Sequence, residues 1–491
     1  MNNIRTYRKI TILFFTILFQ ILFISISPGQ AVDRSEPPQL GPPPTLNLPP
    51  IQKFQLANGL PVVLMEKHQV PLVQINVVVK AGRVNDPVDQ TGLASLTMDM
   101  LDEGAGKRDA LALADAIDYL GARISTSAGY HASRISLHTP LNKLDSALVL
   151  LRDIVLDPTF PEQELERLRK ERLTTLMQWH DQPNTIASIL TSRTLYGENH
   201  PYGETSIGTE KSIRSFTVEN LKDFYHTNFL PNNSAIMVVG DVKPDEIVQK
   251  LENAFGQWKT GKVIPVKLPK VEQVQIRKIL LVDKPGAAQS VISIGRIGLP
   301  RETKDYYAAL VMNTILGGSF TSRLNQNLRE THGYTYGAGS YFMFLTDPGP
   351  FIARSSVQTE VTDKALQEFM KELNDIRSPV TEEELARAKN YISLRYPRNF
   401  ETVNEIADQL EDLIIYHLPD DYFNKYISNI MAISGEQVQQ AADKYIVPGQ
   451  VDIIIVGDRE KVEPGLRNMN LGPIDFYTVE DVLGQVPDLN E

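Results

Sequence analysis

An internal repeat constrains the fold of this 491-residue chain more than any other feature. The segment LDSALVLLRDI, followed by DPTFPEQELERLRKE, has a counterpart in TDKALQEFMKEL, followed by SPVTEEELARAKN. Both copies also end alike, in SAIMVVGDV and VDIIIVGDR. The offsets are 218, 220 and 217 residues for the pairs Leu148 and Leu366, Leu165 and Leu385, and Gly240 and Gly457. A nearly constant offset at separate landmarks predicts a duplicated domain of roughly 210 residues.

Breaks in the apolar pattern divide the rest of the chain. Three basic residues precede an uncharged apolar run over 10–27 and the small residues of PGQA, which is the pattern of an export signal. The run has 18 residues, so both a cleaved signal and an uncleaved anchor stay open. We expect an exported protein, periplasmic or membrane-anchored and facing the periplasm. The predicted parts are a signal (1–31), a proline-rich linker (32–50), a first domain (51–258), an inter-domain linker (259–275), a second domain (276–480) and a tail (481–491).

Within each copy, strand and helix patterns alternate. PVVLME and LVQINVVVK are rich in β-branched residues and are predicted to be neighbouring strands. Residues 110–120 and 162–179 have apolar residues at helical spacing. The sequence therefore predicts an α+β fold with two homologous domains, each a mainly antiparallel sheet with helices packed on one face.

Composition excludes several classes of function. The chain has no cysteine, which excludes disulfides, a thiol nucleophile and cysteine metal ligands. Its formal charge is -11, and removal of a signal with three positive and no negative residues gives -14. Such a charge disfavours binding to nucleic acid. A membrane is expected as a partner only if the signal is uncleaved.

Several segments in this order carry a family resemblance. FQLANGLPVVLMEKHQVPLVQINVVVKAGRVNDPVDQTGLA and the later HPYGETSIGT resemble segments of the pitrilysin/insulinase family of zinc peptidases (inverzincins). The resemblance covers residues 54–458 and is to the mitochondrial-processing-peptidase-like branch of the family, which contains heterodimers. In active members, a helix after the glycine-led turn bears H-x-x-E-H. Its two histidines bind zinc, its glutamate acts as the base, and a glutamate some 76 residues later is the third protein ligand.

The corresponding positions here lack those ligands. GLASLTMDMLDEG places Ser95 and Asp99 where the histidines stand and Met98 where the base stands, and counting onwards gives Thr175 for the third ligand. Methionine has no useful basicity, and a serine, a threonine and one aspartate form a poor zinc site. We therefore expect no catalytic residue, no metal and no cofactor in this chain, with zinc on a partner subunit.

No substitute site is evident among the other titratable residues. None of the eight histidines has H-x-x-E-H or H-x-x-x-H spacing followed by an acid. Asp102 and Glu103 follow the degenerate motif and could serve as acid and base, although helix-cap or surface carboxylates are the favoured interpretation.

The second copy retains the family's other half-site. LGGSFTSRLNQNLRETHGYTYGAGSY resembles the stretch whose arginine and tyrosine hold the substrate opposite the zinc, and the matching residues are Arg329 and Tyr336. The resemblance implies that this guanidinium binds a peptide carbonyl and that this phenol donates to the developing oxyanion.

Together these observations predict a non-catalytic subunit of an exported heterodimeric zinc metallopeptidase. Its expected partners are a homologous subunit with an intact H-x-x-E-H and an extended peptide or unfolded protein, which would add to a sheet edge. Two alternatives remain: a peptide-binding or assembly protein without a hydrolytic role, and a zinc metalloendopeptidase assigned by family membership alone.

Overall fold

The computed structural model describes residue 41 and residues 46–489. The predicted signal lies outside these residues, as does most of the predicted proline-rich linker. Residues 46–489 belong to one compact unit. Over the described part of the chain, no helix combines the length and apolar character needed to cross a bilayer.

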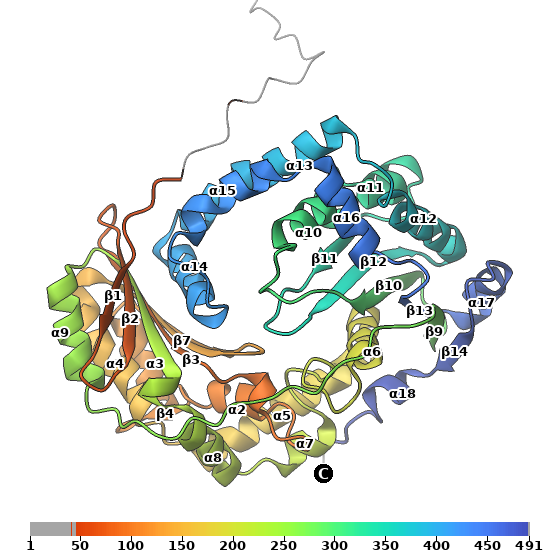
Figure 1. Ribbon diagram of the computed structural model, residues 1–491. Coiled ribbons are helices and arrows are strands. Elements are labelled where there is room, and N and C mark those ends of the chain that lie inside the picture. The colour runs from red at the N-terminus through yellow and green to blue at the C-terminus, as the bar shows by residue number, and fades with distance from the viewer. Residues whose placement is uncertain (1–40, 42–45, 490–491) are drawn as a thin grey trace, which may run out of the picture. The chain divides into compact units, whose positions relative to one another are not determined.

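Two six-stranded sheets form the framework (Figure 1). The first has the order β1-β2-β8-β3-β7-β6 and the second β11-β12-β10-β13-β9-β14. Their strands are β1 (Gln52–Gln55), β2 (Pro61–Glu66), β3 (Leu72–Val79), β6 (Arg123–Ala128), β7 (Ser133–Pro140), β8 (Ser234–Gly240), β9 (Lys278–Asp283), β10 (Gln289–Ile297), β11 (Ala338–Phe342), β12 (Pro350–Gln358), β13 (Asp452–Gly457) and β14 (Ile474–Tyr477). A short hairpin of β4 (Gly104–Ala105) and β5 (Arg108–Asp109) stands apart from both sheets.

The two sheet orders match strand for strand when one is read backwards. β2, β8, β3, β7 and β6 correspond to β9, β13, β10, β12 and β11. Only the outermost strand differs in origin, because β1 precedes the first sheet and pairs antiparallel with β2, whereas β14 follows the second sheet and pairs parallel with β9. The predicted α+β fold of two homologous, mainly antiparallel domains is confirmed.

One expectation about strand neighbours is wrong. The sequence suggested that β2 and β3 pair with each other, but β8 lies between them, parallel to β2 and antiparallel to β3. Every residue of β8 is buried, and a strand without exposed residues suits a central position, because such a strand is covered on both faces. A short connection alone did not reveal that a strand from far along the chain separates the two.

The helices follow in chain order and mostly cover one face of each sheet. They are α2 (Leu93–Asp99), α3 (Ala110–Tyr119), α4 (Leu144–Leu156), α5 (Glu162–Trp179), α6 (Pro183–Tyr196), α7 (Glu210–Ser215), α8 (Val218–Asn228), α9 (Pro244–Phe255), α10 (Tyr306–Asn313), α11 (Arg323–Asn325), α12 (Thr362–Asp375), α13 (Glu382–Arg395), α14 (Val403–Ile415), α15 (Tyr422–Ala432), α16 (Gly435–Tyr445), α17 (Arg459–Asn468) and α18 (Val479–Leu483). α18 crosses the boundary at residue 480 that the sequence suggested and contacts α6.

The second face of each sheet is covered by a helix from the opposite half of the chain (Figure 1). α6, from the first half, packs on β10 and β13. α14, from the second half, packs on β8 and β3. The strand residues alternate accordingly, with Ile454 in the cluster around α6 and Ile453 in the larger core of the second half. Most of each domain's own helices thus lie on one face, as predicted, and the opposite half supplies α6 or α14 as cover for the other face. The exception is α18, which lies beside α6 on the second sheet.

Candidate functional site

Helix α2 presents the degenerate motif. It begins after Gly92, whose φ of 93° favours glycine, and the carboxylate of Asp86 accepts hydrogen bonds from the backbone N–H groups of Gly92 (2.8 Å) and Ala94 (2.7 Å). Four residues separate Ser95 from Asp99, so both lie on one face of the helix. Met98, at the base position, is fully buried in the apolar core.

The guanidinium of Arg172 occupies the space that Ser95 and Asp99 face. Its Nη2 donates to Asp99 Oδ2 at 2.7 Å and to Ser95 Oγ at 2.9 Å. Its Nη1 donates to the carbonyl oxygens of Gly92 at 3.1 Å and Ile207 at 3.0 Å. Arg172 comes from α5 and is only 5% exposed. One buried cation therefore joins α2, α5 and the loop before α7, and we call Ser95, Asp99 and Arg172 the arginine cluster.

The charges of this region are balanced inside the protein. Burial lowers the pKa of Arg172, while the nearby carboxylates of Asp99 and Asp86 raise it. Burial raises the pKa of Asp86 to about 7, against the opposing effect of its two backbone hydrogen bonds and of Arg83 and Arg172. The carboxylate of Asp99 is half exposed and serves as the direct counter-ion of Arg172.

The residues of the arginine cluster do not fit a zinc ion. An open zinc site needs three protein ligands of imidazole, thiolate or carboxylate type. Here the facing groups are a hydroxyl, a carboxylate that already pairs with a guanidinium, and that guanidinium itself, whose charge opposes a cation. Thr175, the predicted third position, donates its hydroxyl to the carbonyl of Glu171 on its own helix at 2.9 Å. Among the described residues there is no group of three or more histidines, cysteines, aspartates or glutamates placed to hold a metal.

A polar cavity of about 380 Å³ borders the same loop. It is lined by α6, by the loop residues Gly203 to Ser206, by Tyr130 and by Arg354 of β12. Ser206 connects this wall to the arginine cluster, because its carbonyl accepts a hydrogen bond from Ser95 Oγ. Arg83 stacks on the Tyr130 ring with its Cζ 3.7 Å from the centroid.

Strand β6 forms an outer edge of the first sheet beside α2. It pairs with β7 on one side, and within the described residues no strand pairs with its other side. Its residues alternate between exposed and half-buried. Such an edge presents backbone donors and acceptors that can pair with an extended peptide.

The two predicted substrate-binding residues lie in the second half. Arg329 is on a turn of π-helix (Gln326–Thr331), with its Nε 3.5 Å from Glu330 Oε1 and its Cζ 4.5 Å from the centre of the Phe320 ring. Tyr336 lies between this turn and β11 and is 93% exposed. In the described part of the chain, no hydrogen bond or ion pair joins either residue to the other or to the arginine cluster.

Comparison with known proteins places this geometry in a family. The model for "Insulinase (Peptidase family M16)" matches residues 61–209, and the model for "Peptidase M16 inactive domain" matches residues 215–392. The chain belongs to the M16 insulinase family. The family resemblance drawn from the sequence is thus confirmed, and the second match includes both Arg329 and Tyr336.

Its M16 relatives carry differing names. The chain is 25% identical to "Uncharacterized zinc protease YmxG" of Bacillus subtilis over 72% of this chain and 85% of that protein. It is 23% identical to "Non-peptidase homolog YmxG" of Helicobacter pylori over 82% of this chain and 93% of that protein. Among solved structures, a peptidase M16 inactive domain from Pseudomonas fluorescens superposes with a TM-score of 0.78 at 27% identity, covering 83% of this chain and 98% of that one.

Sequence reasoning placed Ser95, Met98, Asp99 and Thr175 at the degenerate positions but did not find Arg172. Counting along α5 led to Thr175, one helical turn beyond. A signal was nevertheless present, because Arg172 stands in line with Leu165, Leu168 and Leu176 at helical spacing. A lone arginine on an apolar stripe requires a buried partner.

Proposed function

We propose that this chain is a non-catalytic M16 protein that binds extended peptide and acts as the zinc-less subunit beside a homologous chain with an intact H-x-x-E-H. The observation that carries the proposal is the arginine cluster, which puts a fixed positive charge where an active relative needs a zinc ion. The name "Non-peptidase homolog" of the Helicobacter pylori relative agrees with it.

Peptide binding is assigned to the edge of β6 and the neighbouring polar cavity. The backbone of an extended segment adds to β6 through main-chain hydrogen bonds, which tolerate many sequences, and side chains enter the cavity beside Tyr130 and Arg354. Arg329 and Tyr336 act at the partner's zinc centre in this proposal. The guanidinium holds a substrate carbonyl, and the phenol donates to the oxyanion as negative charge develops. The high exposure of Tyr336 agrees with a group that acts outside its own chain. We place the complex in the periplasm because of the predicted export signal.

The first experiment measures zinc content and hydrolysis of an unstructured peptide by the purified chain, alone and mixed with an H-x-x-E-H-bearing homologue from the same organism. The proposal expects zinc on the homologue, little activity from either chain alone and turnover in the mixture. Arg329→Ala and Tyr336→Phe should each lower the turnover of the mixture, while Lys364→Ala, at an exposed position of α12, should leave it unchanged. Stoichiometric zinc and hydrolysis in this chain alone would overturn the proposal.

A second experiment tests addition to the sheet edge. Two versions of one fluorescent peptide are methylated on backbone nitrogen at alternate residues. Only one set of amides faces a paired strand, so strand addition predicts that one version binds much more weakly and the other nearly normally. Equal binding of both versions would refute strand addition and leave an assembly role as the better account.

A further inference from the structure

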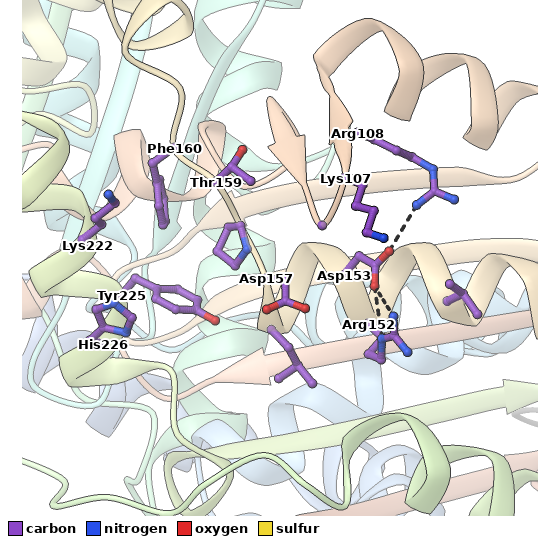
Figure 2. A pocket seen from close by; sticks show the side chains of 14 residues that line it. Lys107, Arg108, Arg152, Asp153, Asp157, Thr159, Phe160, Lys222, Tyr225 and His226 are labelled. Atoms are coloured by element: carbon purple, nitrogen blue, oxygen red, sulfur yellow. Dashed lines mark hydrogen bonds and ion pairs between the residues drawn. The ribbon is translucent and has the colours of Figure 1, made fainter.

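A large cavity lies on the first domain, among elements that the proposed function does not use. Its volume is about 920 Å³, and it lies between the turn of the β4–β5 hairpin, the end of α4, the following loop and α8 (Figure 2). Pockets for small organic ligands have volumes of roughly 300–1,000 Å³. The size of this cavity therefore suits a compact organic molecule.

One end of the cavity holds two arginines fixed by a buried carboxylate. Asp153 is 5% exposed and accepts hydrogen bonds from Arg108 Nη1 at 3.2 Å and Arg152 Nε at 3.1 Å. Gly106 lets the hairpin come this close, since a Cβ at that position would stand 3.1 Å from Asp153 Oδ2. Both guanidinium groups are partly exposed and keep further N–H donors. They are therefore oriented in advance for a carboxylate or phosphate, which a guanidinium binds in a fork.

Two lysines add positive charge to the walls. Lys107, on the hairpin turn, and Lys222, on α8, have no ion pair within the described part of the chain. Asp157 is the second carboxylate of the lining and lies between the two ends (Figure 2). Four cations against two carboxylates leave a formal charge of +2 here, on a chain whose total is -11. Such a local excess attracts an anion, while Asp157 provides an acceptor for a hydroxyl or ammonium group of the same ligand.

The other end is aromatic and held in a strained conformation. Phe160 has φ of 49°, a left-handed value that is costly for a bulky residue, and it directly precedes Pro161, which also disfavours such a backbone. Its ring is buried and meets the Tyr225 ring edge-on with centroids 5.7 Å apart. Tyr225 is fixed in turn by a hydrogen bond of 2.7 Å to the carbonyl of Val155. Strain of this kind persists where the surrounding structure enforces it, and it concentrates at binding sites.

We infer that this cavity binds a small organic anion, with its carboxylate or phosphate between Lys107 and the two arginines and its aromatic or apolar body against Phe160 and Tyr225. This site is separate from the arginine cluster, from the edge of β6 and from Arg329 and Tyr336, and its occupancy is independent of any partner subunit.

The test is titration calorimetry of the full mature chain at low ionic strength. The probes are phenyl phosphate, N-acetylphenylalanine, inorganic phosphate and phenol. The two aromatic anions distinguish phosphate from carboxylate as the preferred head group. Inorganic phosphate supplies only an anionic head group, and phenol supplies only the aromatic ring. We expect saturable binding of at least one aromatic anion, with inorganic phosphate and phenol each bound at least about tenfold more weakly.

Variants then locate the binding site. Lys107→Ala removes a cation at the head-group end that supports no ion pair, so the fold should be retained and the aromatic anion should bind about tenfold more weakly. Lys222→Ala removes the lysine at the aromatic end (Figure 2) and should weaken the anion less than Lys107→Ala does. Lys211→Ala, at an exposed position of α7, is the matched control and should not change the affinity. Absence of saturable binding by both aromatic anions would overturn the inference, and so would equal affinity of the Lys107→Ala/Lys222→Ala double variant and the parent chain.

Discussion

Replacement of Arg172 by methionine should lower the free energy of unfolding far more than replacement of an exposed arginine on the same helix. Methionine keeps much of the apolar stem but removes all four hydrogen bonds, which leaves the Ile207 carbonyl without its donor and Asp99 without its counter-ion, whereas the Gly92 carbonyl still accepts from the N–H of Leu96. Removing one partner of a buried ion pair costs roughly 3–5 kcal/mol. Asp99 is half exposed and can regain water, so we place the loss at about 3 kcal/mol, near the lower end of that range.

The assay is urea unfolding at pH 7 followed by intrinsic fluorescence, and Trp179 at the end of α5 provides a reporter close to the cluster. Arg167→Met is the matched control on the same helix. Arg167 makes ion pairs with three glutamates, but its side chain is 43% exposed, and exposed pairs contribute at most about 1 kcal/mol. The reasoning would be refuted if Arg172→Met lowered the free energy of unfolding no more than Arg167→Met.

Three further predictions concern the metal, the pH dependence and a close approach of two elements. The quadruple variant Ser95→His, Met98→Glu, Asp99→His and Thr175→Glu restores the family's zinc ligands and base. It should retain zinc through gel filtration only when Arg172→Leu is added, because the guanidinium otherwise occupies the site. Equal retention of zinc with Arg172 present would contradict this prediction. Burial raises the pKa of Glu411 to about 7 and that of Asp412 to about 6, above their ordinary values of about 4. The stability that they contribute is therefore present below about pH 4 and is lost as pH rises to about 7. Glu411→Gln should flatten this decline in urea midpoints, and an unchanged slope would argue against the reasoning. Gly317→Ala should lower the melting temperature by an amount equivalent to about 2 kcal/mol, because the new Cβ would stand 2.3 Å from the Ser340 amide nitrogen. Gly449→Ala, where a new Cβ would meet no atom within 4 Å, should be nearly neutral. Similar melting temperatures for the two variants would contradict the packing argument.

The duplicated framework could be predicted from the sequence because the information is local and present twice. The strand pairs of the two sheets occupy equivalent positions, and the offset between SAIMVVGDV and VDIIIVGDR already located β8 and β13 as counterparts. The loss of the zinc ligands was likewise readable from GLASLTMDMLDEG, because ligand spacing on a helix is a local property.

Features that depend on distant segments could not be predicted in the same way. The insertion of β8 between β2 and β3 joins residues more than 150 positions apart, and the apolar patterns of α6 and α14 show that each helix has a buried face without showing which sheet covers it. Arg172 was predictable from the sequence in one respect and not in another. Its position on an apolar stripe was visible in the sequence, but its partners became evident only when α2 and α5 were brought together.

The reciprocal placement of α6 and α14 means that neither half of the chain is a self-sufficient folding unit. Expressed alone, the first half would expose the apolar residues of β8 that α14 covers, and the second half would expose those of β13 that α6 covers. Two copies of a single repeat could satisfy both sheets by each lending its helix to the other, which is the geometry of a domain-swapped dimer. This chain carries that arrangement within one covalent molecule, so a protease cut between its halves should leave them associated.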